Sequence, residues 1–418
     1  MLNQREQRVL AQCDACFDDT LTVLRELIAE YSVLGREHGA LAVMQKWFER
    51  LGLPVEHVPL DDPELYRNPH HAPVEWSNAG RFNVVARLNP DSPKPHLVFN
   101  GHLDVVPAEP IDMWTRPPWE PWECDGWLYG RGAGDMKAGI AAMVMAVHAY
   151  RQAGETLDFP LTLQAVIEEE CTGNGALACV NRGLAGDFVL IPEPFGAQIY
   201  TGQIGVIRFR IRVDGVPAHV LDTSAGSSAI ERLQALIPAL KALEEELNTA
   251  PRTPPYDGLT HPFNLNIGRI EGGNWASSVP AHALLEGRFG FAPDVSPETV
   301  MEQIRRCVLQ AHEALGSDAT PPRIEFHGFR SEGHLVDLES PGVQLLAQCH
   351  RSLTDSEPGH YLSTCTTDLR AFHVAAGVAG TCYGPVAQRI HGVDECVEIE
   401  SIRHTLKTYA LFLCRWAG

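Results

Sequence analysis

The feature that most constrains the fold is an almost wholly apolar run, Leu161–Ile167, that ends abruptly in three adjacent glutamates. A strand of this kind is buried on both faces, as in a parallel sheet covered by helices. Phe188–Ile191 is a second such run, and Asn83–Leu88 and His96–Phe99 are shorter strand candidates. Helical periods separate them, for example across Ala138–Ala149. This alternation predicts a doubly wound α/β core with a mostly parallel sheet, whose ligands bind beyond the carboxyl ends of the strands.

A second pattern begins near residue 203. Val206–Val213 alternates apolar and basic side chains, which is typical of a strand with one solvated face. The elements that follow have a β-α-β-β-α-β order, typical of an α+β sandwich of one antiparallel sheet and two helices. We expect helices over 227–247 and 297–315, and strands over 265–270, 283–291 and 323–326. The α/β pattern returns near residue 332, so residues 203–331 are predicted to be inserted into a unit made of residues 1–202 and 332–418.

The composition narrows the class of protein. The 418 residues carry a formal charge of −20, which argues against nucleic acid and anionic membranes as partners. No apolar run approaches the length of a bilayer span, and Met1–Arg8 contains no apolar signal core. Eleven cysteines occur in a chain too large to need disulfide bonds for stability, which favours reduced thiols. We therefore expect a cytoplasmic protein.

Five short stretches each contain a side chain that can hold a metal ion, at points where a strand should give way to a loop. The candidate ligands are His102, Asp135, Glu170, Glu193 and His391. Imidazoles and carboxylates form a ligand set that suits zinc, manganese or cobalt. Each residue taken singly is also compatible with a turn or a solvated loop. Their joint occurrence favours a site for two metal ions.

The run Glu168-Glu169-Glu170 supports this interpretation. Three adjacent carboxylates repel each other, and partial burial makes the repulsion worse. Cations beside them would remove the conflict. One carboxylate could then be a ligand while its neighbour moves protons.

Two rival chemistries are weaker. The glycines of 130–134 could cradle a phosphate, but neither GxGxxG nor GxxxxGK[ST] is present. Cys171 could be the nucleophile of a cysteine amidohydrolase. The carboxylates beside it would raise the pKa of its thiol rather than lower it, so this alternative is disfavoured.

Several motifs together resemble a known family. They are GHLDVVP at 101–107, GRGAGDMKAG at 130–139, EEECTGNG at 168–175, PEP at 192–194 and YGPVAQRIHGVDE at 383–395. In this order they resemble the co-catalytic zinc metallopeptidases that include acetylornithine deacetylase, succinyl-diaminopimelate desuccinylase, aminoacylase and glutamate-releasing carboxypeptidases. The resemblance implies a catalytic α/β domain, here 1–202 and 332–418, interrupted by a lid and dimerisation domain, here 203–331.

The resemblance also implies the metal ligands. Asp135 is similar to a carboxylate that bridges two divalent metal ions, expected to be zinc, with cobalt or manganese as alternatives. His102 and Glu193 would complete one site. Glu170 and His391 would complete the other.

Two further roles follow from the resemblance. Asp104 resembles the residue that orients the first histidine ligand, and Glu169 resembles the general base. Counting from Gly175 makes Glu169 the base and Glu170 the ligand. A slip of one residue would give these roles to Glu168 and Glu169, and this alternative stays open.

Other candidates concern the substrate. His219, in a Gly-x-x-Ala-His pattern at 215–219, resembles a histidine that enters the active site of the partner subunit and helps hold the oxyanion. A homodimer through the lid is therefore expected. Thr367 and Arg370 resemble a substrate-contacting segment. Asn274 and Ser277 precede the Val-Pro pair at 279–280, where the family usually has an asparagine, and are further candidates.

One departure bears on the substrate. The family usually places an arginine that grips a substrate carboxylate where this chain has Gly290. Arg288 lies two residues earlier, on the same face of the predicted strand. Whether it reaches the substrate is open.

The expected reaction is hydrolysis of the amide bond of a small N-acyl amino acid or diamino acid, by a hydroxide bridging the two metals and with Glu169 as general base. Because the arginine is shifted, a deformylase or amidohydrolase for an N-acylated heterocyclic or aromatic amine is the alternative. A non-catalytic metal-dependent binding protein is more distant, and the intact candidate base argues against it.

Overall fold

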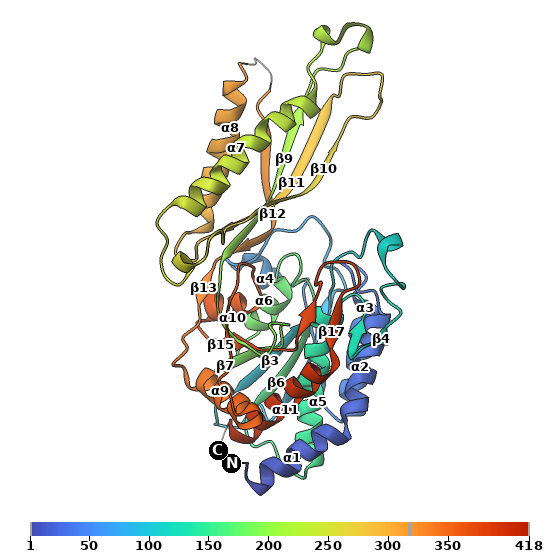
Figure 1. Ribbon diagram of the computed structural model, residues 1–418, viewed down its shortest axis with the longest axis vertical. Helices are drawn as coiled ribbons and strands as arrows, with labels where there is room; N and C mark the ends of the chain where they lie inside the picture. Colours follow the sequence, from blue (N-terminus) through green and yellow to red (C-terminus); the bar gives the residue numbers. More distant parts are fainter. Residues whose placement is uncertain (1, 317–319, 417–418) are drawn as a thin grey trace.

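The apolar strands form the central sheet of the larger domain in the computed structural model, which describes residues 2–316 and 320–416 (Figure 1). The sheet has the order β1–β2–β6–β3–β7–β15. Its strands are β1 (Val55–Pro59), β2 (Phe82–Leu88), β3 (Leu97–His102), β6 (Leu161–Val166), β7 (Phe188–Ile191) and β15 (Ala379–Cys382). Only β2 runs against the others, because its pairings with β1 and β6 are antiparallel and the pairings from β6 to β15 are parallel. The predicted mixed, mostly parallel sheet is confirmed.

Helices cover both faces of this sheet (Figure 1). The layer around α5 contains α1 (Gln4–Ala15), α2 (Phe17–Ala29), α5 (Ala138–Gln152), α9 (Pro341–Thr354) and α11 (Ile399–Arg415). The layer around α6 contains α4 (Pro63–Arg67), α6 (Asn174–Asn181) and α10 (Leu369–Ala376). Helix α3 (His38–Arg50) packs against α2, the edge strand β1 and its neighbour β2. No helix in the described part of the chain is both long and apolar enough to cross a membrane.

Three elements near the N-terminus were not predicted. Helix α1 begins with a capping box, in which Asn3 accepts from the backbone of Glu6 and the Glu6 carboxylate accepts from the backbone of Asn3. This Asn-x-x-Glu pattern is a sequence signal that could have identified the helix. Strand β1 lies in a stretch without strong alternation, and α4 is only five residues long.

The smaller domain is the predicted β-α-β-β-α-β unit, shown in the upper part of Figure 1. Its elements are β9 (Gly205–Asp214), α7 (Ala229–Thr249), β10 (Leu265–Gly272), β11 (His282–Phe291), α8 (Pro297–Ala314) and β12 (Arg323–Ser331). The sheet order is β10–β11–β9–β12, antiparallel throughout. Both helices bury apolar side chains against one face of the sheet, in a hydrophobic cluster separate from that of the larger domain. The exact boundaries at residues 202 and 331 stay a prediction.

Two small sheets complete the larger domain. One has the order β13 (His334–Leu335), β8 (Ile199–Gln203), β14 (His360–Leu362). The other has the order β16 (Ala387–Gln388), β17 (Cys396–Glu398), β5 (Trp127–Tyr129), β4 (Trp122–Cys124). Through the second sheet the chain after residue 386 lies beside the segment before residue 133, which brings two of the predicted metal stretches together.

Candidate metal centre

Three neighbouring strands deliver the first group of polar side chains. The parallel strands β6, β3 and β7 are adjacent, so their carboxyl ends meet at one edge of the sheet. His102 is the last residue of β3, paired with Val166 of β6. Strand β3 is therefore longer than the expected His96–Phe99. Glu169 follows β6 and Glu193 follows β7, as the sequence predicted.

The second group comes from loops. Asp135 lies in the turn Ala133–Lys137 that leads into α5, and its own backbone is not helical (φ −107°, ψ 97°). The carboxylate of Glu395 fixes this turn, because it accepts hydrogen bonds from the backbone N–H groups of Gly134 (2.9 Å) and Asp135 (3.0 Å) and from the guanidinium of Arg131 (2.6 Å). Glu395 thus positions Asp135 from the far end of the sequence.

His391 lies in the loop between β16 and β17 and closes the cluster. Its Nε2 atom lies 3.1 Å from Glu170 Oε2 and 3.5 Å from Asp135 Oδ2. On the other side of Asp135, His102 Nε2 lies 3.2 Å from Asp135 Oδ1 and 3.8 Å from Glu193 Oε1. Asp135 therefore lies between the two imidazoles. The five predicted ligands converge.

This donor set fits divalent metal ions. One ligand atom each of His102, Asp135 and Glu170 lies within 4.8 Å of the other two. Two neutral imidazoles with several carboxylates suit zinc, cobalt or manganese, and a carboxylate between two histidines has one oxygen for each of two ions. The residues present therefore fit the expected pair of cations.

Asp104 orients His102 through its backbone carbonyl. His102 Nδ1 lies 3.0 Å from the backbone carbonyl of Asp104, whereas the nearest carboxylate oxygen is 3.7 Å away. The carbonyl therefore fixes the ring, with Nε2 directed at the cluster. The Asp104 carboxylate instead accepts from the backbone N–H groups of Glu169 (3.3 Å) and Glu170 (3.1 Å).

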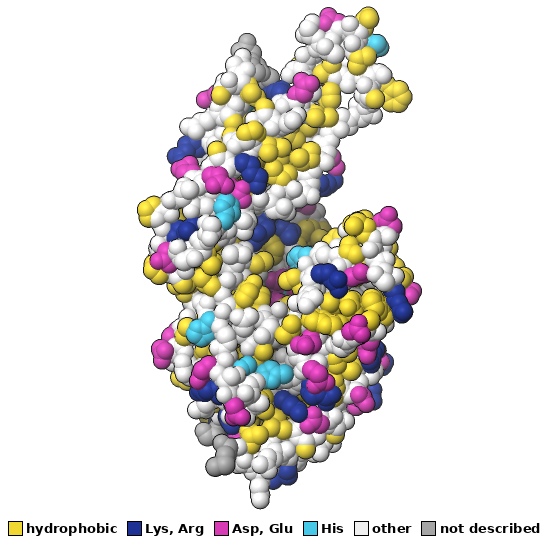
Figure 2. All heavy atoms as spheres, viewed as in Figure 1, with side chains coloured by type: hydrophobic (Ala, Val, Ile, Leu, Met, Phe, Trp, Pro, Cys, Tyr) yellow, Lys and Arg dark blue, Asp and Glu magenta, His cyan; other side chains and the backbone are white. Residues whose placement is uncertain are grey.

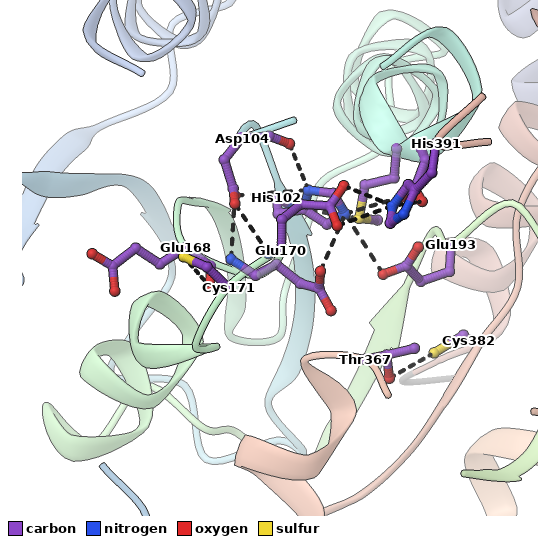
Figure 3. Close-up of polar contacts among 12 residues, drawn as sticks. His102, Asp104, Glu168, Glu170, Cys171, Glu193, Thr367, Cys382 and His391 are labelled. Carbon is purple, nitrogen blue, oxygen red and sulfur yellow. Dashed lines mark hydrogen bonds and ion pairs between the residues drawn. The ribbon is translucent and has the colours of Figure 1, made fainter. Parts of the chain in front are cut away.

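Of the three adjacent glutamates, Glu168 and Glu170 point in different directions (Figure 3). Glu168 turns away from the cluster, where its carboxylate pairs with the Arg81 guanidinium and accepts from the indole of Trp76 (2.8 Å). Glu169 is buried, with Oε2 3.9 Å from His102 Nε2, and Glu170 faces His391. This geometry favours the first of the two registers considered for the sequence.

Burial and mutual repulsion shift the pKa values strongly in the metal-free protein. Burial, together with neighbouring carboxylates, raises the pKa values of Glu169 and Glu193 well above their ordinary range. Burial alone would lower the pKa values of both histidines. The surrounding carboxylates nevertheless raise that of His102 well above its usual value and that of His391 to about 11. The site thus holds an excess of negative charge that a cation would neutralise.

A cavity of about 740 Å³ opens in front of the cluster. Glu169, Glu170 and His391 line its floor, and side chains of the lid sheet, including Arg208 and Arg288, line its opposite wall. Figure 2 shows the hollow between the two domains, with basic side chains on its lid side and acidic ones below. A small substrate can therefore reach the cluster while contacting the lid.

The other predicted substrate residues occupy different positions. Thr367 is buried and its hydroxyl is bonded to Gln203 (3.0 Å), while Arg370 is buried and donates to the carbonyl of Thr172. Neither lines the cavity, which is reached instead by Cys365 and Thr366. The segment therefore borders the cavity through other residues than the two named from the sequence, and its contact with a substrate stays a prediction.

Three predicted residues lie on the lid, away from the cavity of their own chain. His219, Asn274 and Ser277 are exposed on the loops at the end of the lid sheet. His219 and Ser278 form an isolated bridge that ties these loops together. In Figure 1 these loops project from the lid on the side far from the larger domain. The chain does not bring them to its own metal centre.

Sequence reasoning missed several residues of the site. Glu395 lay within a quoted motif, but only the fold shows that it holds the Asp135 turn. Asp368 is buried beneath the cluster with no hydrogen-bond partner for either carboxylate oxygen among the residues described, and burial raises its pKa to about 7. Arg81 and Arg208 carry no local sequence signal, because their partners are distant in the chain.

With the site described, the comparisons with known proteins can be placed beside it. The model of peptidase family M20/M25/M40 matches residues 98–415, which include every candidate ligand. This chain belongs to that family. The predicted family resemblance is confirmed.

Relatives within the M20/M25/M40 family cover most of the chain. The N-formyl-4-amino-5-aminomethyl-2-methylpyrimidine deformylase of Bacillus subtilis (strain 168) is 30% identical over 361 residues, 81% of this chain and 84% of that protein. The succinyl-diaminopimelate desuccinylase of Variovorax paradoxus (strain S110) is 28% identical over 404 residues, 93% and 95% of the two chains.

Solved structures of the family have the same architecture. The dipeptidase Dug1p of Saccharomyces cerevisiae matches with a TM-score of 0.82 and 16% identity over 98% of both chains. Human carnosine dipeptidase 1 matches with a TM-score of 0.78 and 18% identity over 99% of both. These likenesses confirm the fold, a catalytic domain with a lid. The predicted class of enzyme, a metal-dependent hydrolase of amide bonds in N-acyl compounds, is confirmed at the level of the family.

Proposed function

We propose that this protein hydrolyses the amide bond of a small N-acyl amino acid or diamino acid, with Glu169 as the general base. The single observation that carries this assignment is the position of Glu169. It is buried, borders the cavity and lies beside His102, while its neighbour Glu168 is engaged by Arg81. Relatives named as a desuccinylase and a deformylase support an N-acyl substrate.

The metal ligands would be His102 and Glu193 for one ion and Glu170 and His391 for the other, with Asp135 shared. Zinc is our proposal for the native ion, and cobalt or manganese would suit the same donors. When bound, the ions supply Lewis acidity, which lowers the pKa of water and polarises a carbonyl group.

The chemistry of the chain itself centres on proton transfer. Glu169 accepts a proton from the attacking water and then delivers it to the nitrogen of the departing amine. Asp104 keeps the base in place through the backbone N–H groups of Glu169 and Glu170.

We further propose that the protein acts as a homodimer and that His219 of one subunit stabilises the oxyanion in the other. The lid loops support this proposal because they expose large apolar side chains, with Leu221 90% and Trp275 72% accessible. His219 lies among them and does not reach the metal centre of its own chain. We also propose a cytoplasmic location, in line with eleven free cysteines.

Two alternative functions, a cysteine-dependent amidohydrolase and a deformylase, can be weighed at the same site. A cysteine nucleophile is disfavoured, because burial and the neighbouring Asp104 and Glu168 raise the pKa of the Cys171 thiol well above its usual value. A deformylase acting on an N-acylated heterocyclic amine stays the second candidate, because a relative at 30% identity bears that name.

The decisive experiment compares two neighbouring glutamates. Glu169→Gln should retain bound metal and lose turnover of N-acyl amides by a factor of about 10² or more, because the general base is gone. Glu168→Gln is the matched control: it should keep turnover within about tenfold and lower the free energy of unfolding, because Arg81 loses a charged partner. Metal content, kcat and urea unfolding are measured on both. Normal turnover by metal-loaded Glu169→Gln would contradict the assignment.

A further inference from the structure

Residues 72–81 join the two domains beside the metal centre, and we call them the connector. They lie between α4 and β2, form no helix or strand, and precede residue 98, where the match to the family model begins. Ala72 ties the start of the connector to the larger domain. Its N–H donates to the side chain of Asn174 (3.0 Å), and its carbonyl accepts from the same side chain (2.9 Å). The family match assigns no role to this segment.

The connector contacts the lid at two points. The carbonyl of Pro73 accepts from the backbone N–H of Gly328 on β12 (2.9 Å). The Glu75 carboxylate accepts from both terminal nitrogens of the Arg210 guanidinium on β9, at 2.7 and 3.0 Å. Two parallel charge-assisted bonds fix the orientation of both groups as well as their separation. The position of the connector therefore depends on the position of the lid sheet.

The next residue of the connector contacts the glutamate run. The indole of Trp76 donates to Glu168 Oε1 (2.8 Å). Glu168 has a φ of 71°, in the left-handed region that is unfavourable for a residue with a Cβ atom. Its carboxylate is held in this conformation by Trp76, Arg81 and Thr172 (2.7 Å). This turn of the backbone directs Glu168 away from the metal centre and leaves Glu169 at the cavity.

Among these three partners, Trp76 is the one whose position depends on the lid. Arg81 is also paired with Glu37, the N-cap residue of α3, and is thereby fixed within the larger domain. The third partner lies in the same loop as Glu168 itself. Trp76 directly follows Glu75, so a displacement of the lid reaches the Glu168 carboxylate across one peptide bond.

Strand β9 also contacts the other end of the glutamate run. Arg208 lies two residues before Arg210, on the same face of the strand. It donates to the backbone carbonyl of Glu170 (2.7 Å). Alternate side chains of one lid strand thus hold Glu170 directly and Glu168 through the connector. Glu169 lies between these two points of attachment.

We propose that the connector sets the position of the general base relative to the lid, with Glu75 and Trp76 as positioning residues for Glu169. This role rests on the proposed function of Glu169. Neither Glu75 nor Trp76 lines the cavity, so their contribution belongs to turnover rather than to substrate binding. A small displacement of the base slows turnover, because proton transfer requires hydrogen-bond distance.

The test removes the two contacts singly and together. Trp76→Phe loses the indole donor but keeps an aromatic ring, and it should lower kcat about fivefold with KM and metal content within about twofold. Glu75→Gln loses the charge and should lower kcat about threefold. Because both contacts lie on one path, the double variant should lose about fivefold rather than the roughly fifteenfold loss of independent effects. Kinetics are measured on whichever of a panel of N-acetyl, N-succinyl and N-formyl amides the metal-loaded protein hydrolyses fastest.

Glu325→Gln is the matched control. Glu325 approaches the same Arg210 guanidinium (3.5 Å), and its side chain is as exposed as that of Glu75, 57% in both cases, but it lies on β12 within the lid. This variant should keep kcat within about 1.5-fold. Three results would each overturn the connector and leave the proposed function standing: an unchanged kcat in Trp76→Phe, fully multiplicative losses in the double variant, or equal losses in Glu75→Gln and Glu325→Gln.

If no amide of the panel is hydrolysed, the proposed function fails and hydrogen exchange decides the connector. The backbone N–H groups of Thr172 and Gly173 donate to the carbonyl of Glu168 (3.0 and 2.6 Å). In the metal-loaded protein, Glu75→Gln should speed the exchange of these two amides about threefold or more, and Glu325→Gln should not. Exchange that neither variant changes, or that both change equally, would overturn the connector.

Discussion

The lid sheet and the metal centre treat charge in opposite ways. On the lid, Arg210 contacts three carboxylates, those of Glu75, Glu286 and Glu325. The directly opposed Arg212 and Arg323 share the carboxylate of Asp214. At the metal centre four carboxylates surround His102, and no arginine or lysine forms an ion pair with any of those four among the described residues. The charges around Arg210 and Asp214 are neutralised within the chain, whereas the metal centre carries negative charge that a cation would neutralise.

The difference separates a structural surface from a binding surface. Charged side chains that are paired within the chain stabilise the fold and are not available to bind a charged ligand. Charges that are buried without opposite partners are costly, and they persist where a ligand supplies the missing charge. By this criterion the acidic cluster, which borders the cavity, is a place where an added cation completes the charge balance.

The largest expected effect comes from removing the cations. Exhaustive chelation should lower turnover by at least about 10³-fold and loosen the segments 168–170 and 388–396, because their carboxylates and imidazoles lose the charge that holds them together. Turnover assays and hydrogen exchange would show this. The lid sheet is the internal control, and its exchange should not change. Full activity in protein stripped of divalent ions would contradict the metal centre.

The second-largest effect concerns His219, a lid residue proposed to act at the metal centre of the partner subunit. His219→Ala should lower kcat by about 10²-fold, because one donor to the oxyanion is lost. If this donor acts in the partner subunit, mixing His219→Ala with Glu169→Gln should restore about a quarter of the normal activity, through mixed dimers with one intact site.

His282→Ala, at another exposed lid histidine, serves as the control and should have no such effect. A mixture no more active than its components would argue against action in the partner subunit.

The acidic cluster also predicts how metal binding depends on pH. In the metal-free protein the carboxylates beside His391 raise its pKa to about 11, so the ring holds a proton at neutral pH. The imidazole must lose this proton to become a ligand, and affinity for zinc should therefore rise about tenfold per pH unit between roughly pH 6 and 8 for each proton released. Competition with a chelator at several pH values measures this. Affinity that falls with rising pH would contradict the assignment.

The smallest effect is expected on the lid. Arg210→Met should lower the free energy of unfolding by about 1 kcal/mol, because Arg210 is largely buried against Glu286. Arg87→Met removes an exposed pair with Glu56 and should cost less than about 0.5 kcal/mol. Urea unfolding of both variants gives the comparison. Equal losses would show that burial of the lid network adds nothing.

Much of the fold could be predicted from the sequence because its signals are local. The apolar runs of β6 and β7 and the alternation of β9 define strands within a few residues, and polar side chains after such strands define a binding edge. The small sheet formed by β16, β17, β5 and β4 has strands of two or three residues and could not be seen in this way.

The site was predicted less completely because its partners are distant. The register of the three glutamates depends on Arg81, 87 residues away from Glu168, and no spacing rule reveals such a pair. The contacts of Thr367 and Arg370 depend on Gln203 and Thr172, which lie beside them only in the folded chain.

The position of Glu395 has a consequence for how the protein is made. The turn that carries Asp135 is tied by a carboxylate encoded 260 residues later, and His391 also follows the lid in the sequence. A nascent chain on the ribosome therefore exposes its first ligands long before the last ones exist. The metal centre can form completely only when synthesis is nearly finished. Shortened products that end before residue 391 lack the residues needed to bind a full complement of metal ions.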